Sequence, residues 1–420
     1  MPEDHLAQAD SGIAYGRQRK GYDPDLVEVG PGTPCGEFMR RYWHPVDISA
    51  RLKERPKQIR ILGEDLILFR DKSGRPGLIT PRCAHRGAPM SYAKVEEQGI
   101  RCPYHGWLFD VEGRCLNQPC EPDGGRARDR VRQPWYPVQE QYGLVFAYLG
   151  PPGKKPVLPR WDAFENLGSD EKIVPDAAAF SVGGDETAEL IPWAWMQDWE
   201  NTMDPHHVVI LHTSFSGAQF TPAMAIMPDV TWEPTELGMR YVAYRKLPDG
   251  REVDRVTNVI FPNIRSVPNV ALTHGVAESL GWLVPIDDRS HRTFHITRMP
   301  KAFNGVPMVT APAWPDGKKW SEMTEEEHWV TPGDWEIQSG LGEDGITLHG
   351  EEFLATSDRG VVMSRRLLKR QIKVVQDGGD PIGVSFDPDA PPSIVGSGNF
   401  YRDMPRGQRA VAAMKAPSAF

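Results

Sequence analysis

The sequence predicts an α+β protein in which a small all-β domain precedes a larger domain of antiparallel strands and helices. Short apolar segments bounded by glycine and proline fill residues 58–150, as is typical of a small β domain. A proline-rich linker follows at residues 150–156. Beyond it strand and helix patterns mix, and 420 residues exceed one ordinary domain. We therefore expect an arm at residues 1–40 and domains at residues 41–152 and 153–420.

The composition excludes several classes of partner. Hydrophobic residues make up 40% of the chain and charged residues 25%, as in ordinary soluble globular proteins. The net charge of −9 argues against nucleic acid or an anionic membrane surface as a partner. No apolar run reaches the roughly 18 residues of a membrane-spanning helix, and residues 1–11 lack the apolar core of a secretion signal. We expect a cytoplasmic protein.

The first domain contains several predicted strands. Residues 59–62 and 66–69 are apolar and flank Gly63-Glu64-Asp65, a pattern that predicts a β-hairpin. Residues 77–80 and 144–149 predict further short strands. Loops between such strands suit residues that must be held rigidly for binding or chemistry.

Two matched motifs, Cys83-Ala84-His85 and Cys102-Pro103-Tyr104-His105, lie in these loops. Two thiolates and two imidazoles hold a [2Fe-2S] cluster with two Cys on one iron and two His on the other. The same donors hold zinc, but zinc sites usually pair Cys with Cys and His with His, so the cluster is favoured. An odd number of cysteines argues against a disulfide framework. Three cysteines have no histidine close behind them and are interpreted as ordinary thiols: Cys35, Cys115 and Cys120.

The second domain combines helices with antiparallel strands. A helix begins in the tryptophan-rich stretch at residues 193–199, and Ser357-Asp358 starts another that Gly378-Gly379 stops. The tail from Asp380 is rich in Pro and Gly and is expected to wrap over the surface or over a neighbouring subunit. Four strands are predicted, at residues 239–246, 256–261, 281–285 and 292–298.

A second metal site is predicted in the segment from Asn201 to His212. Two histidines and one carboxylate on one face hold the Fe(II) of enzymes that activate O₂. His207 and His212 would lie about 140° apart on a regular helix, so they cannot both bind one ion from it. Either the helix ends between them or it contains an i→i+5 bulge. His206 and His212 fit no better, so geometry leaves the choice open.

The motifs together resemble one family. Cys83-Ala84-His85-Arg86-Gly87 and Cys102-Pro103-Tyr104-His105-Gly106-Trp107 are similar to the two cluster loops of the Rieske family. The resemblance implies that Cys83 and Cys102 bind one iron of the cluster and His85 and His105 the other. It also implies an antiparallel-sheet-plus-helices second domain of the helix-grip type.

The spacing Asp204-x-x-His207-x-x-x-x-His212 is similar to the metal motif of Rieske oxygenase catalytic domains. This resemblance implies that both histidines bind mononuclear Fe(II) and that His206 does not. It also implies that Asp204 connects a metal histidine with a cluster histidine of the adjacent subunit, whereas the residues alone also allow Asp204 to be a helix cap.

The carboxylate ligand is expected far downstream. Residues 332–338 resemble the segment that supplies it in this family, which makes Asp334 the predicted third ligand. Three other acidic residues are alternatives: Glu343, Asp344 and Asp358.

Residues 345–349 and 355–360, with Arg365-Arg366, resemble the phthalate dioxygenase-like branch, which includes aromatic O-demethylases. The resemblance implies an oxygenase component that hydroxylates or O-demethylates an aromatic, carboxylated compound with O₂. The chain has no G-x-G-x-x-G after a strand, so electrons must come from a separate NAD(P)H-dependent reductase, with or without a ferredoxin. The family implies a homotrimer or a hexamer.

The strand at residues 256–263 is expected to line the substrate pocket, with Asn258 and Phe261 as contacts. A carboxylated substrate would need a cation there. Each basic residue near the strands is by itself expected to be solvated: Arg240, Arg245, Lys246, Arg255 and Arg265. The alternative functions are an electron-transfer or redox-sensing Rieske protein with a ligand-binding second domain, and a zinc-binding structural module.

Overall fold

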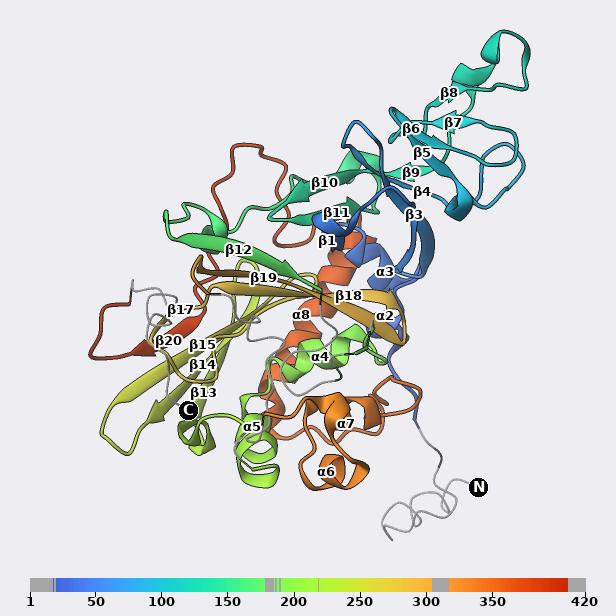
Figure 1. Cartoon of the computed structure of the whole chain (residues 1–420). Helices are drawn as coiled ribbons and strands as arrows, with labels where there is room; N and C mark the ends of the chain where they lie inside the picture. The colour runs from blue at the N-terminus through green and yellow to red at the C-terminus, as the bar shows by residue number, and fades with distance from the viewer. Residues whose placement is uncertain are drawn as a thin grey trace, which may run out of the picture.

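The computed structural model describes residues 18, 20–177, 185, 187–188, 190–217, 219–303 and 317–406. A small strand-rich domain projects from a larger body built on one curved sheet (Figure 1). Of the predicted arm, residues 1–17 and 19 lie outside the described residues. The rest of the arm contains two short helices, α2 (Pro24–Val27) and α3 (Pro34–Met39).

The described part of the first domain contains small antiparallel sheets. One has the order β2-β3-β4-β9 and another the order β5-β6-β7-β8. The predicted hairpin is confirmed: β2 and β3 join through Leu62 and Gly63, whose φ angles of 48° and 78° suit a two-residue turn matched to strand twist. The strands are β2 (Lys57–Ile61), β3 (Glu64–Arg70), β4 (Pro76–Ile79), β5 (Lys94–Glu96), β6 (Gly99–Arg101), β7 (Leu108–Phe109), β8 (Cys115–Asn117) and β9 (Trp135–Tyr136).

A third small sheet ties this domain to the body. It has the order β1-β11-β10, from β1 (Trp43–Ile48), β10 (Val138–Gln141) and β11 (Leu144–Tyr148). The Phe146 ring lies 5.9 Å from the Trp282 ring of the large sheet, within one continuous apolar core. The predicted linker is packed rather than free, since the Trp43 indole donates to the Pro156 carbonyl at 2.9 Å. The boundary at residue 152 stays a prediction.

The large antiparallel sheet has the order β12-β19-β18-β16-β15-β14-β13. Its strands include the four predicted ones, each longer than predicted. Successive residues alternate between the two faces of the sheet. Trp282 packs on Phe146 of the first domain, and its neighbour Gly281 lies on the opposite face. The strands are β12 (Glu171–Asp176), β13 (Asp229–Pro234), β14 (Gly238–Lys246), β15 (Glu252–Ile260), β16 (Ile264–Ser266), β18 (Ser279–Asp287) and β19 (Ser290–Pro300).

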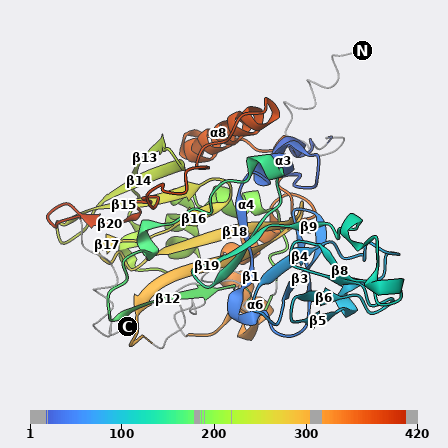
Figure 2. The same ribbon diagram turned by 90° about the horizontal axis from the view of Figure 1, so that it is seen from above.

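Helices cover the face of the large sheet opposite to Trp282, where Gly281 lies. In Figure 2, α4 lies between the sheet and α8. The predicted long helix is confirmed, and Gly378 (φ 83°) and Gly379 end it by donating to the Val375 and Val374 carbonyls. Asp358 occupies the N-cap position at its start, as predicted, but its carboxylate accepts from the Ala355 amide at 2.7 Å instead of from an amide of the helix. The helices of this domain are α4 (Trp195–Asn201), α5 (Pro205–Val209), α6 (Glu325–Val330), α7 (Asp334–Gly340) and α8 (Arg359–Gln376).

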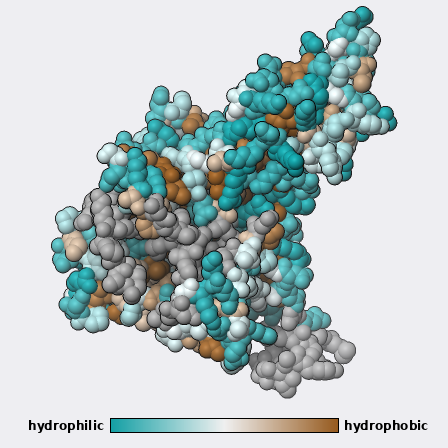
Figure 3. All heavy atoms as spheres, viewed as in Figure 1, coloured by the Kyte–Doolittle hydropathy of each residue, from teal (hydrophilic) through white to brown (hydrophobic). Residues whose placement is uncertain are grey.

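The described part of the tail does more than wrap over the surface as predicted. It returns to the large sheet as β20 (Gly398–Tyr401), which pairs with β15 and with β17 (Gly275–Val276). Asn399 holds it there, because its buried amide donates to the Asn269 and Thr273 carbonyls. Among the described residues, no helix is both long and apolar enough to cross a membrane. On the face shown in Figure 3, hydrophobic residues of the projecting domain form small groups among hydrophilic ones.

Candidate active site and metal centres

The two cluster loops share one backbone conformation. The amide of Gly87 donates to the Cys83 carbonyl at 2.9 Å, and that of Gly106 to the Cys102 carbonyl at 3.1 Å. Both glycines have φ near +70° (71° and 72°), a region that a side chain disfavours. Each turn therefore brings its Cys and His to the same end of the domain.

The donor atoms meet at this end. The rings of His85 and His105 lie 4.6 Å apart, and both cysteines are buried. Burial and the neighbouring Cys102 thiol raise the pKa of Cys83 to about 11, so a bound cation is needed to hold it as a thiolate at neutral pH. The Nδ1 atom of His85 is buried with no hydrogen-bond partner in the described structure. An unpaired imidazole nitrogen beside two thiols fits the cluster.

Two further residues support the loops: Trp107, which ends the second motif, and Gln133, which the sequence did not single out. The Trp107 ring stacks on His85 at 4.2 Å and 5°. The buried Gln133 amide accepts from the Ala84 amide at 2.8 Å and donates to the Arg82 carbonyl at 2.8 Å. No local pattern marks Gln133, because it lies 31 residues beyond the second motif cysteine.

The second centre begins at a capped helix. Asp204 is the N-cap of α5, and its Oδ1 accepts from the His206 and His207 amides at 2.9 and 3.3 Å. α5 ends at Val209 and the backbone widens into a π-helix over Ile210–Phe215, which is the i→i+5 alternative of the two that the spacing allowed. The wider turn brings His212 beside His207, with ring centres 5.4 Å apart.

Asp334, the first residue of α7, completes the group. One ligand atom from each of His207, His212 and Asp334 lies within 4.8 Å of the others. Asp334 Oδ2 is 3.2 Å from His212 Nε2, and Oδ1 is 3.8 Å from His207 Nε2. Burial opposes ionisation of Asp334, but the two imidazoles outweigh it and hold its pKa well below the usual range. Two histidines and one carboxylate on one side fit Fe(II).

The other candidate ligands lie elsewhere. Asp344 is exposed and pairs with Arg289 at 2.9 Å. Asp358 accepts from a backbone amide at the start of α8, and Glu343 forms a β-bridge with Ile346. The ring of His206 is turned toward Trp232, 5.9 Å away, and is not part of the group.

A second layer of contacts orients the three side chains. Asp204 Oδ2 lies 3.4 Å from His207 Nδ1, and burial of His207 is outweighed by Asp204 and Asp334, so its pKa is raised. The Asn201 amide donates to Asp334 Oδ1 at 3.1 Å. Gln219 Oε1 lies 2.6 Å from His212 Nδ1. Asn201 and Gln219 were missed, because their partners are set by the tertiary fold and by no motif.

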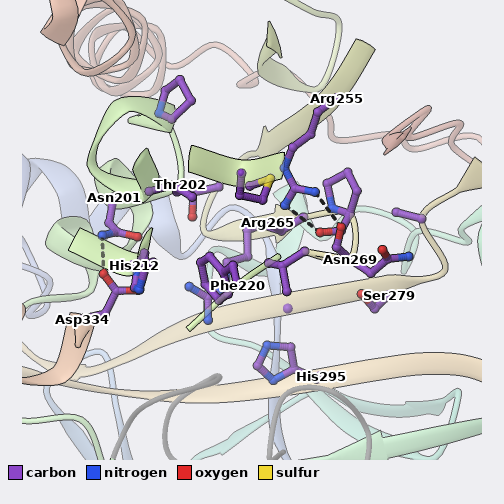
Figure 4. A pocket seen from close by; sticks show the side chains of 18 of the residues that line it. Asn201, Thr202, His212, Phe220, Arg255, Arg265, Asn269, Ser279, His295 and Asp334 are labelled. Atoms are coloured by element: carbon purple, nitrogen blue, oxygen red, sulfur yellow. Dashed lines mark hydrogen bonds and ion pairs between the residues drawn. The ribbon is translucent and has the colours of Figure 1, made fainter. Parts of the chain in front are cut away.

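A cavity of about 240 Å³ lies between this centre and the helix-covered face of the large sheet, where Gly281 is part of its lining. Asn201, His212 and Asp334 lie at one side of it, and Arg255 and Asn269 at the other (Figure 4). Much of its lining is apolar, including Val208, Phe220, Met224, Val267, Val270, Met299 and Phe303.

Neither of the two predicted substrate contacts, Asn258 and Phe261, lines this cavity. Asn258 lies three positions after the cavity-lining Arg255 on β15 and therefore faces the opposite side of the sheet, where its amide donates to Ser397. Phe261 is buried in the core, where it stacks on Trp199 at 5.6 Å and meets Phe38 edge-on at 5.7 Å.

Three basic residues that were expected to be solvated are instead buried and line the cavity. They are Arg245, Arg255 and Arg265, with 1%, 4% and 8% exposure. Arg265 pairs with buried Asp198 at 2.6 Å. Arg240 stays partly exposed and pairs with Glu233, and Lys246 is exposed at the end of β14.

The two centres lie far apart within one chain. Figure 1 places β5 to β8 at the tip of the projecting domain and α5 and α7 at the opposite end of the body.

Comparisons with known proteins agree with this arrangement. The Rieske [2Fe-2S] domain family matches residues 42–137. The chain is 50% identical over 392 residues to the phenoxybenzoate dioxygenase subunit alpha of Ectopseudomonas oleovorans, covering 93% of this chain and 94% of that protein. It is 32% identical over 376 residues to the 5,5'-dehydrodivanillate O-demethylase oxygenase subunit of Sphingobium sp. (strain NBRC 103272 / SYK-6), covering 86% and 82%. The solved structure of the Pseudomonas putida CBB5 NdmA QL mutant with caffeine aligns with a TM-score of 0.62 at 17% identity, covering 85% and 99%, which shows the fold alone.

A cluster-binding β domain joined to a two-histidine, one-carboxylate centre defines a Rieske-type oxygenase. The chain belongs to the Rieske non-haem iron aromatic ring-hydroxylating oxygenases, as an α subunit of the phthalate dioxygenase-like branch. It is an oxygenase component of a multicomponent system, with a [2Fe-2S] cluster and a mononuclear iron as cofactors, rather than a simple electron carrier.

Proposed function

We propose that the enzyme incorporates oxygen from O₂ into an aromatic carboxylate, either by hydroxylating the ring or by removing an O-alkyl group. One observation carries this proposal: His207, His212 and Asp334 open onto a largely apolar cavity that also contains buried arginines. Apolar walls suit an aromatic ring, and buried guanidinium groups suit a carboxylate. The names of the relatives support the same class, since one is a phenoxybenzoate dioxygenase and another an O-demethylase.

The metal-binding roles follow from the donor sets. Cys83 and Cys102 would hold one iron of the cluster and His85 and His105 the other. The mononuclear iron would be held by three residues, His207, His212 and Asp334. When bound, this iron supplies reductive activation of O₂ beside the substrate.

Asp204 has two roles in this scheme. Its Oδ1 caps α5, which fixes the backbone at His207. Its Oδ2 lies 3.4 Å from His207 Nδ1, an ion-pair distance, and its negative charge favours a proton on that nitrogen. Burial opposes ionisation of Asp204, but His207 and the two backbone amides outweigh it and lower its pKa. The carboxylate is therefore charged at neutral pH.

Electrons would cross between subunits. The cluster loops and the mononuclear centre lie at opposite ends of one chain, so a neighbouring copy must bring its loops to Asp204 (Figure 1). A homotrimer, or a hexamer of two trimers, provides this arrangement by symmetry. A separate NAD(P)H-dependent reductase, with or without a ferredoxin, would supply the electrons. The expected compartment is the cytoplasm.

Labelled oxygen tests the proposal. The iron-loaded protein, a reductase and NADH are incubated under ¹⁸O₂ with a panel of benzoates, phthalates, methoxybenzoates and phenoxybenzoates. We expect one panel acid to yield either a product with two labelled oxygens on the ring or a hydroxylated product with release of an aldehyde or alcohol fragment. In O-dealkylation the phenol keeps the substrate's ether oxygen and the label enters the released fragment, so electron consumption that yields neither a ring-labelled product nor a dealkylated acid from any of them would contradict the proposal.

A further inference from the structure

Two guanidinium groups share one wall of the cavity. Arg245 lies on β14 and Arg255 on the adjacent strand β15, where Ala243 pairs with Arg255 and Arg245 pairs with Val253. This register makes the two arginines diagonal neighbours on the same face of the sheet. Both side chains are almost completely buried, and both line the cavity.

Neither arginine has an acidic partner among the described residues. Arg265 pairs with Asp198, and Arg298 pairs with Glu171 and Glu278. A buried charge without a counter-ion is costly, so an unpaired pair of cations in a cavity indicates an anion that arrives from outside.

The hydrogen bonds of the two side chains differ. Arg255 is held by the protein, because it donates to the Pro268 and Asn269 carbonyls and to the Asn399 amide oxygen. Arg245 donates only its Nε, to the Ile226 carbonyl at 2.9 Å, and its buried Nη1 has no partner in the described structure. Burial and the charge of Arg255 lower the pKa of Arg245 to about 10, which still leaves it protonated at neutral pH.

Arg255 lies across the cavity from the metal ligands. In Figure 4, Arg255 and Asn269 lie on one side, Asn201, His212 and Asp334 on the other, and Phe220 between them. A ligand that reaches both sides must therefore be anionic at one end and apolar in the middle.

We propose that Arg245 and Arg255 form the subsite that binds the substrate carboxylate and points it away from the iron. Arg245 supplies the free donors of a planar fork, and Arg255 adds a fixed positive charge beside it. The part of the aromatic acid that reacts is then the part remote from its carboxylate. This inference rests on the proposed function, because it assumes that the substrate is an aromatic acid.

Binding of a matched pair of ligands tests it without turnover. The anaerobic, iron-loaded protein is titrated calorimetrically with 3-phenoxybenzoate and with its neutral isostere 3-phenoxybenzamide. We expect the acid to bind about 10- to 100-fold more tightly, as for a hydrogen bond to a charged group. Arg245→Gln should abolish this preference, and Arg245→Lys should retain only part of it because lysine lacks the planar fork.

Arg240→Gln is the matched control. Arg240 lies on the same strand but on the opposite face, where it pairs with Glu233, and this variant should keep the full preference. Cluster absorbance and the thermal midpoint check that each variant is folded. The subsite is overturned if the wild type does not prefer the acid, or if Arg245→Gln keeps the preference. Failure of the proposed function looks different: the acid preference depends on Arg245, yet no aromatic acid is hydroxylated with labelled oxygen or O-dealkylated.

Discussion

Replacing Gln219 by leucine should weaken iron binding without disturbing the cluster. The Gln219 side-chain oxygen lies 2.6 Å from His212 Nδ1, which makes it the acceptor that holds this proton and leaves Nε2 for the metal. The Gln219 amide also reaches the Pro332 carbonyl at 3.4 Å, two residues before Asp334. One side chain therefore connects the segments that carry two of the ligands.

The size of the effect follows from burial. His212 is 2% exposed, so leucine would leave its N–H unpaired away from water, at a cost of about 1–3 kcal/mol. If this cost falls on the metal-bound state, affinity drops about 10- to 100-fold, the range usual for such supporting residues. Gln219→Glu keeps an acceptor and should bind metal at least as well as the wild type.

The assay is titration of the iron-free mononuclear site with Co(II), whose visible bands report ligand geometry, and with Fe(II) against a chelator. Cluster absorbance provides an internal check in each sample. Gln376→Leu is the control, because it makes the same chemical change at an exposed position at the end of α8. The reasoning is refuted if the Gln219→Leu variant binds Co(II) like the wild type, or if Gln219→Glu is weakened equally.

Three further predictions follow. Asp204→Asn keeps a good helix cap but removes the charge beside His207, so the iron content should persist. Oxidation of the reduced cluster by O₂ and substrate should slow about 10- to 100-fold in stopped-flow absorbance. An unchanged rate would refute the role of Asp204. Arg365→Met leaves the buried Glu200 carboxylate without its partner and should cost about 3–5 kcal/mol in urea unfolding, with partial recovery in the double variant with Glu200→Gln. Burial lowers the pKa of His44 to about 4, so below pH 6.5 the unfolded chain binds more protons than the folded one. The free energy of unfolding should therefore fall by about 3 kcal/mol as the pH drops from 6.5 to 4. His44→Gln should flatten this dependence.

The sequence predicts the metal-binding segments well because their chemistry is local. Each cluster loop carries its Cys and His within four residues, and a spacing of five between His207 and His212 already requires a widened or broken helix. Asp334 required a resemblance, since its place beside the histidines depends on how α7 packs, 122 residues after His212.

The cavity could not be predicted in the same way. Nearly every residue of β15 is buried, on both faces, so no alternation of polar and apolar residues shows which face lines the cavity. Asn258 was therefore expected in the pocket and Arg255 in solvent, whereas the Asn258 amide donates to Ser397 of the tail and Arg255 lines the cavity. The strand β20 was missed for a related reason, since its partners lie about 145 residues earlier in the chain.

The most direct test of the wiring is the iron content of active protein. A cluster plus a mononuclear centre requires about three irons and two acid-labile sulfides per chain. We predict that His207→Ala lowers iron to about two per chain, keeps both sulfides and the cluster spectrum, and loses product formation. A fully active wild type with only two irons per chain, or a His207→Ala variant that keeps the third, would contradict the account.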